Sequence, residues 1–188
     1  HHAILQSAIE SHNGYVFQII GDAFCAAFHT AIDGLGAAIE AQRAFQTSEV
    51  SPTGTMSETS EVLPLRVRMG LHTGSAEIYG NEYHGYLTLA RVQRVMSVAY
   101  GGQILLSNAT VELIHNELPE GITLRDMKEH HLKGLLNPEC LWQIVAPDLH
   151  LRAADAGGEQ AEAVELRALG AEFVAQVQRH GLLVERHG

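Results

Sequence analysis

The stretch that most constrains the fold is Tyr15 to Phe28, which reads YVFQIIGDAFCAAF. Two apolar runs, Tyr15–Ile20 and Ala23–Phe28, flank the pair Gly21-Asp22. Such a pair between apolar runs predicts a tight β-hairpin, because the turn needs a residue that accepts positive φ. The hairpin would present one carboxylate, Asp22, at its tip. That carboxylate either caps backbone N–H groups or binds a metal ion, and the hairpin alone favours capping.

Charge and composition narrow the class of protein. The 188 residues suit one domain of ordinary size, and 46% of them are hydrophobic, enough for a full core. The net charge of −10 argues against nucleic-acid binding, which needs a basic face. No apolar run approaches the roughly 20 residues that span a membrane. Cys25 and Cys140 stand apart in apolar contexts, so we expect free thiols in a reducing compartment, the cytoplasm.

Hydrophobic periodicity predicts an alternation of helices and strands after the hairpin. We expect an α+β fold with helices packed on one face of a sheet. The predicted helices are His1–Ser11, Ala31–Phe45, Leu87–Val98 and a short one ending at Ile114, and the predicted strands are Leu63–Thr73, Gln103–Ser107, Ile122–Leu132 and Cys140–Val145.

The character of the chain changes after Ala146. Pro147 ends the last predicted strand, and Ala153–Gly158 is small and flexible in composition. Gln160 to Arg179 carries apolar residues at helical spacing. The sequence therefore predicts a domain over residues 1–146, followed over 147–188 by a linker and a C-terminal helix outside it.

Four segments in order resemble the catalytic domain of the class III nucleotidyl cyclases, the adenylate and guanylate cyclases. They are NGYVFQIIGDAFCAAF, LRVRMGLHTG, ARVQRVM followed by GGQILLS, and LKGLLNPECLWQI. The resemblance covers residues 1 to 146. It implies a ferredoxin-like sheet whose first strand lies upstream of His1, and a purine nucleotide substrate that is cyclised with release of pyrophosphate.

The resemblance assigns metal binding to Asp22. In the family two carboxylates hold two Mg²⁺ or Mn²⁺ ions, which stabilise charge and activate the attacking ribose oxygen. The second carboxylate belongs to the family's first strand. The chain therefore supplies half of the metal site, and we expect it to be inactive alone.

The resemblance also assigns two positions that read the purine. Gln18, four residues before Asp22, takes one of them, and its amide accepts either adenine or guanine. Glu82 takes the other, three residues before Gly85, and as an acid it favours ATP over GTP. The alternatives are a solvent-facing strand residue for Gln18 and a solvated loop acid for Glu82.

Phosphate contacts are implied for two basic residues. Arg94, seven residues before Gly101-Gly102, matches the family's catalytic Arg, with Arg91 ranked second. Lys133 matches the lysine that meets the triphosphate, for which a flexible point charge is suited. The position of the ribose-orienting Asn falls on Ala90, which has no hydrogen-bonding side chain. Arg68 is expected to support the hairpin acid.

Further expectations concern assembly and function. The twelve histidines form no metal-binding motif, and we interpret them as surface or packing residues. Family members share their active sites across a homodimer. The sequence thus predicts a cyclase domain, favouring cyclic AMP over cyclic GMP, within a longer intracellular signalling protein. The alternative is an inactive cyclase-homology domain that dimerises or senses nucleotides.

Overall fold

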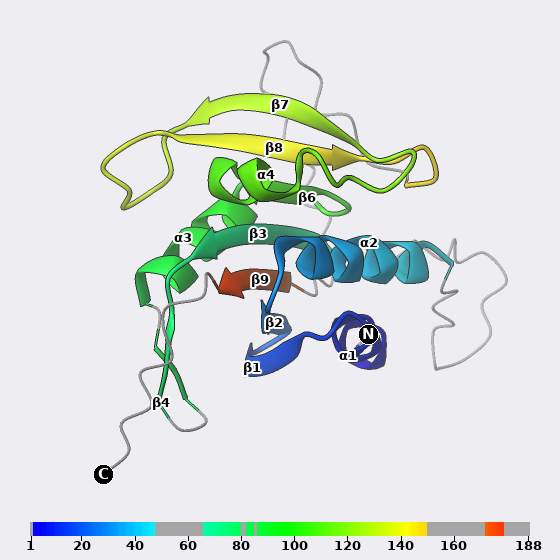
Figure 1. Cartoon of the computed structure of the whole chain (residues 1–188), viewed down its shortest axis with the longest axis horizontal. Helices are drawn as coiled ribbons and strands as arrows, with labels where there is room; N and C mark the ends of the chain where they lie inside the picture. Colours follow the sequence, from blue (N-terminus) through cyan, green and yellow to red (C-terminus); the bar gives the residue numbers. More distant parts are fainter. Residues whose placement is uncertain (1, 48–65, 80–81, 85, 150–171, 179–188) are drawn as a thin grey trace, which may run out of the picture.

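A computed structural model describes residues 2–47, 66–79, 82–84, 86–149 and 172–178. One sheet of seven strands, in the order β1-β2-β9-β3-β6-β8-β7, forms the body, and β4 and β5 form a separate two-stranded sheet (Figure 1). The elements are α1 (His2–Ser11), β1 (Tyr15–Ile20), β2 (Ala23–Phe28), α2 (Ala31–Thr47), β3 (Arg68–Gly74), β4 (Glu77–Tyr79), β5 (Glu82–His84), α3 (Tyr86–Ser97), β6 (Ile104–Ser107), α4 (Asn108–Ile114), β7 (Thr123–His130), β8 (Glu139–Val145) and β9 (Glu172–Gln178).

The predicted hairpin is confirmed. Strands β1 and β2 pair antiparallel, with Ile20 opposite Ala23 across the turn. Gly21 adopts a φ of 62°, the left-handed conformation that the turn requires and that glycine adopts without steric cost. Every residue of β2 is buried, whereas β1 is largely exposed. The hairpin therefore has one strand in the core and one at the edge of the sheet.

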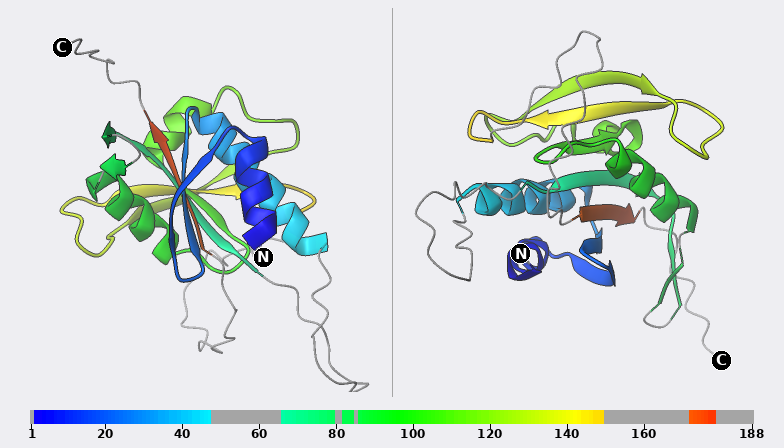
Figure 2. Two further views of the ribbon diagram at one scale, coloured as in Figure 1. Left: turned by 90° about the horizontal axis from the view of Figure 1, so that it is seen from below. Right: turned by 180° about the vertical axis from the view of Figure 1, so that it is seen from behind.

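The α+β class is confirmed, but the expectation that all helices lie on one face is wrong for α3. Phe24 and Phe28 of β2 pack into the core formed with α1, α2 and α4. The intervening Cys25 packs instead against Val92 and Met96 of α3. Because alternate strand residues point to opposite faces, α3 covers the other side of the sheet (Figure 2, left). The unbroken apolar run AFCAAF is typical of a strand covered on both faces.

The tail differs from the sequence prediction. Glu172–Gln178, expected as part of a helix, forms strand β9 between β2 and β3 and runs parallel to both (Figure 1). The inner edges of β2 and β3 would otherwise leave buried backbone N–H and C=O groups without partners, and β9 satisfies both edges. Residues 150–171 and 179–188 lie outside the described residues, so the extent of the domain there stays a prediction.

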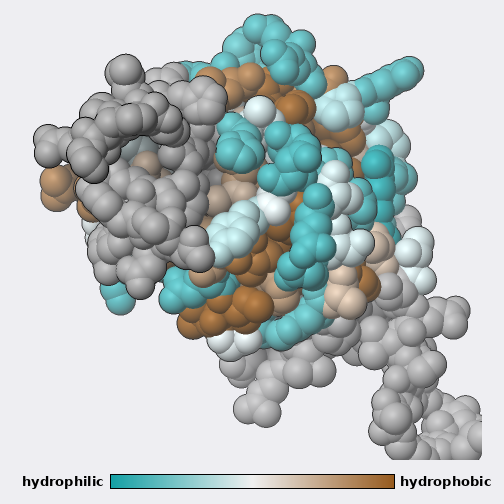
Figure 3. All heavy atoms as spheres, turned by 60° about the horizontal axis from the view of Figure 1, so that its bottom comes forward, coloured by the Kyte–Doolittle hydropathy of each residue, from teal (hydrophilic) through white to brown (hydrophobic). Residues whose placement is uncertain are grey.

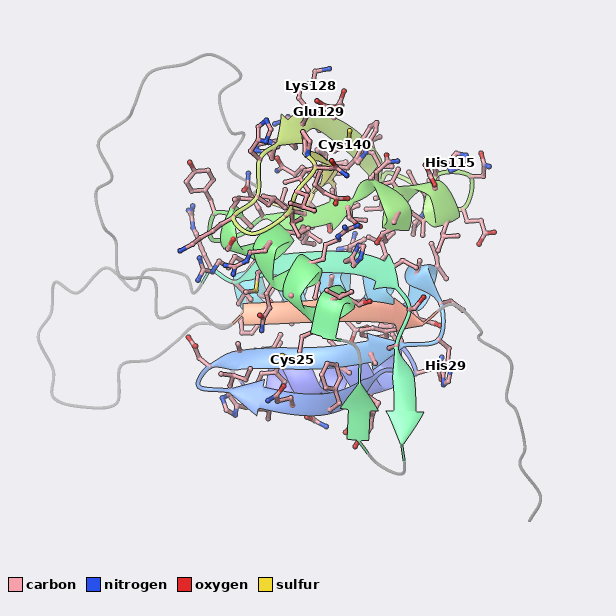
Figure 4. The ribbon with its side chains drawn as sticks, turned by 90° about the vertical axis from the view of Figure 1, so that its left-hand side faces the viewer. Cys25, His29, His115, Lys128, Glu129 and Cys140 are labelled. Atoms are coloured by element: carbon pink, nitrogen blue, oxygen red, sulfur yellow. The ribbon has the colours of Figure 1, made fainter. Side chains whose placement is uncertain are left out.

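Strands β4 and β5, here called the arm, form a hairpin that projects from the body (Figure 4). Strand β3 ends at Gly74, and the first strand of the arm begins at Glu77. Tyr79 and Glu82 pair across the arm. In the described part of the chain, no helix is long and apolar enough to cross a membrane.

Candidate functional site

Asp22, the predicted metal ligand, lies exposed at the tip of the β1–β2 hairpin. The strand that follows it is held in place by burial, since Phe24 and Cys25 are almost completely inaccessible to solvent. Gln18 is also exposed and stands opposite Cys25 at a register irregularity of β1. The structure thus presents both side chains to solvent from a strand pair that the core anchors.

A cavity of about 290 Å³ lies beside this tip. Its lining joins the turn-flanking residues Ile20 and Ala23 to Gln93 and Ser97 of α3. The described lining is completed by Cys25, Arg68 and Met96. The buried lining residues Ala23, Cys25 and Met96 are apolar, and other lining side chains are polar, a combination common in small-molecule sites. The cavity brings together the sequence neighbours of Asp22 and of Arg94, while neither of these two belongs to its described lining.

Helix α3 carries the two candidate arginines in different environments. Arg94 is exposed in the last turn of α3, and no described residue forms an ion pair with it. Arg91 lies 3.7 Å from a carboxylate oxygen of Glu139, whose side chain is 12% exposed. Burial raises the pKa of Glu139, and Arg91 opposes that rise. Arg94 is therefore the arginine of the two that remains available to a ligand.

Lys133 is an exposed residue next to Leu132, which packs against Val95 and Ala99 of α3. The Lys133 segment and the β1–β2 hairpin therefore both pack against α3. Glu82 begins β5 of the arm, which belongs to a different sheet from the β1–β2 hairpin. The structure therefore gathers the segments of Asp22, Arg94 and Lys133 around one helix and leaves Glu82 on a projecting element.

A buried polar cluster was not predicted as part of the site. His72 of β3 is 4% exposed, and its Nδ1 lies 2.6 Å from the hydroxyl of Ser107. Ser107 in turn contacts Thr110, which contacts Thr73. Burial, with a smaller contribution from Arg91, lowers the pKa of His72 to about 4, so His72 is neutral near pH 7. The prediction of histidines as packing residues fits His72, but its polar partners lie far apart in the sequence.

The described residues do not form a complete metal site. No group of three His, Cys, Asp or Glu side chains among them could hold an ion. Asp22 is a single exposed carboxylate, and Mg²⁺ commonly requires one or two carboxylates together with substrate phosphates. Asp22 could contribute one ligand, so the expected two-ion site is not accounted for by these residues.

Comparison with known proteins places these features in a family. The profile of the adenylate and guanylate cyclase catalytic domain matches residues 1–145. An uncharacterized protein of Mycobacterium tuberculosis is 35% identical over 147 residues, covering 77% of this chain and 46% of the relative. Receptor-type adenylate cyclase B of Leishmania donovani is 27% identical over 168 residues, covering 72% of this chain and 12% of that protein. The chain thus spans about half or less of the length of these relatives.

Solved structures share the fold. Adenylate cyclases from Trypanosoma brucei, described in their monomeric state, match with a TM-score of 0.64 at 22% identity, over 81% of this chain and 79% of theirs. An adenylate/guanylate cyclase/hydrolase from Silicibacter pomeroyi matches with a TM-score of 0.62 at 22% identity, over 76% and 79%. Because the family profile matches residues 1–145, the chain belongs to the adenylate and guanylate cyclase catalytic domain family, and the solved structures share its fold.

Proposed function

We propose that this chain is the catalytic domain of a purine nucleotide cyclase that forms cyclic AMP and pyrophosphate from ATP. The observation that carries the proposal is the cavity that joins the neighbours of Asp22, on a hairpin whose inner strand is buried, to the neighbours of Arg94 in α3. An acid and an arginine whose sequence neighbours line one cavity suit a triphosphate with a bound cation. Glu82 and the relatives named adenylate cyclases support ATP as the substrate.

Each proposed residue has one task in this site. Asp22 contributes a ligand to divalent Mg²⁺ or Mn²⁺, which when bound supplies charge stabilisation at the phosphates. Arg94 contacts the phosphate at which substitution occurs, Lys133 the remaining phosphates, and Gln18 and Glu82 the purine. Because Asp22 is one carboxylate, a complete site requires a further ligand from outside the described residues, and we propose that the described part alone is inactive.

A homodimer with shared sites is part of the proposal. The β1 edge of the sheet carries Tyr15, Ile19 and Ile20, each about half exposed. Figure 3 looks toward this side of the molecule, where hydrophobic side chains reach the surface between hydrophilic ones. Exposed apolar residues gathered on an edge strand favour association with another chain. We propose that the domain lies in the cytoplasm and acts in signal transduction.

The second candidate is a cyclase-homology domain that binds nucleotides or dimerises without catalysis. Ala90, on the exposed side of α3, favours it, because a methyl group cannot orient a ribose by hydrogen bonding. Gln18 is the other residue that motivates it, since its amide does not select one purine.

The full-length natural protein, supplied with Mn²⁺ and either ATP or GTP, tests both candidates. We expect cyclic AMP from the wild type and a loss of at least 100-fold for Asp22→Ala, roughly the effect of removing a positioned catalytic group. Asp33→Ala, in the first turn of α2, is the matched control and should retain activity. Activity that survives Asp22→Ala contradicts the enzyme proposal, and nucleotide binding without turnover supports the second candidate.

A further inference from the structure

The junction between the body and the arm is fixed by a hydrogen bond from α3. Thr88, in the first turns of that helix, is 6% exposed. Its hydroxyl donates to the backbone carbonyl oxygen of Ser75 at 2.6 Å. Ser75 lies between the end of β3 at Gly74 and the start of β4 at Glu77. This bond therefore joins the root of the arm to α3.

Close packing at Gly74 holds the same junction. A Cβ atom at Gly74 would stand 2.6 Å from the Thr88 hydroxyl oxygen, 2.8 Å from its methyl carbon and 3.2 Å from Nε2 of His72. The two distances to Thr88 are shorter than real Cβ contacts allow, and the distance to His72 is tight, so only glycine lets β3 approach Thr88 this closely. His72 is itself fixed by its contact with Ser107. The root of the arm is thus packed against Thr88 of α3 and against His72, which Ser107 of β6 holds in place.

Further out, the described backbone of the arm does not pair with the large sheet. Among the described residues, β4 and β5 pair with each other. A lone two-stranded hairpin is marginally stable in water. Each strand has three residues, about 10 Å of length. A rotation of about 20° at the root would therefore displace the far end by roughly 3 Å, a displacement of the kind that disrupts a binding site.

We propose that Thr88 is a positioning residue that fixes the direction of the arm through Ser75 and thereby sets where Glu82 meets the purine. The part of the proposal that concerns the purine rests on the proposed function. The part that concerns the arm does not.

Hydrogen exchange measured by mass spectrometry on the whole chain tests the arm. Thr88→Val removes the hydroxyl and keeps the shape, and we expect peptides covering residues 75–86 to exchange roughly fivefold faster. Thr88→Ser restores the hydroxyl and should restore wild-type exchange. Thr47→Val is the matched control, because Thr47 also donates to helix carbonyls, at the exposed end of α2. Unchanged arm exchange in Thr88→Val, or equal acceleration in β7 and β8, would overturn the proposal.

Nucleotide affinity measured with fluorescent ATP and GTP analogues in the presence of Mn²⁺ tests the link to Glu82. We expect Thr88→Val to reduce the preference between the two nucleotides by a factor of roughly 10, and Thr88→Ser to retain it. An unchanged preference together with faster arm exchange overturns the role in purine selection. A wild-type chain that binds neither nucleotide contradicts the proposed function, while the exchange result still decides whether Thr88 positions the arm.

Discussion

The two hairpins of this domain carry candidate site residues in opposite ways. In β1–β2 the inner strand is buried at all six positions and pairs on both sides within the large sheet. The arm pairs with itself and is held at its root by Thr88, Gly74 and His72. Asp22 is consequently positioned by the hydrophobic core, whereas Glu82 is positioned by a local junction. Substitutions should therefore affect the two hairpins by different mechanisms and by different amounts.

The largest effect is expected where the core supports the first hairpin. Phe24→Ala removes a side chain that is 1% exposed, and we expect a loss of about 4 kcal/mol in the free energy of unfolding, because a cavity remains. Denaturant titration measures it. Leu136→Ala, at a fully exposed leucine, is the control and should change stability by less than about 0.5 kcal/mol. A Phe24→Ala loss below about 1 kcal/mol would show that β2 is not anchored by the core.

Acid should weaken the buried polar cluster of His72, Ser107, Thr110 and Thr73 beside the root of the arm. The unfolded chain protonates His72 near its ordinary pKa of 6.5, whereas the folded pKa is about 4. Between these values the unfolded state binds more protons, so the free energy of unfolding falls as the pH falls from 6.5 to 4, by roughly 3 kcal/mol. His72→Gln should flatten this slope, and His115→Gln, at an exposed histidine, should not. If the free energy of unfolding depends on pH equally in the wild type and in His72→Gln, His72 is not the cause of the dependence.

The arm root should respond to added volume. Gly74→Ala places a methyl group against Thr88 and His72, and we expect a loss of about 2 kcal/mol by overpacking, with faster proteolysis within the arm. Gly34→Ala is the matched control, since its new methyl group meets Phe28 at an ordinary 3.4 Å and alanine favours the helix. Thermal unfolding and limited proteolysis measure both variants. A Gly74→Ala protein as stable and protected as Gly34→Ala would exclude a tight junction.

The smallest effect is expected at the hairpin turn. A Cβ at Gly21 meets no atom within 4 Å, so Gly21→Ala suffers from the φ of 62° alone, with a cost of about 1 kcal/mol. Gly21→Asn should recover most of that loss, because asparagine tolerates the left-handed conformation. Chemical denaturation of the two variants gives the comparison. Equal losses for alanine and asparagine would indicate a different turn conformation.

Local pattern was sufficient to predict the β1–β2 hairpin and the helices α1 to α4, because alternation and helical spacing report the environment of each residue. The placement of α3 on the second face was missed, since amphipathicity shows that a helix packs but not on which face. Glu172–Gln178 was predicted as helix because Phe173 and Val177 fit a helical period. The need of β2 and β3 for backbone hydrogen-bond partners outweighed that helical preference. This need cannot be seen in the sequence near residues 172–178, because β2 and β3 lie far away along the chain.

The elements that carry the candidate site residues were predictable from single motifs. Asp22 lies on the predicted turn and Arg94 in the predicted helix, and both are exposed, while their roles stay predictions. The contacts among Thr88, Ser75 and Gly74 were not predictable, because a hydroxyl that donates to a carbonyl 13 positions away leaves no signature in composition or periodicity. The same holds for His72 and Ser107, which meet across 35 positions.

The central position of β9 has a consequence for the order in which the molecule folds. Ala23 pairs with Glu172, a separation of 149 positions, so the middle of the sheet closes only after Glu172 has been synthesised. Pairings between distant segments are slow to form and leave strand edges open meanwhile. We expect β2 and β3 to acquire hydrogen-exchange protection late in refolding, after β7 and β8. Early protection of β2 would show instead that the β1–β2 hairpin becomes stable before β9 pairs with it.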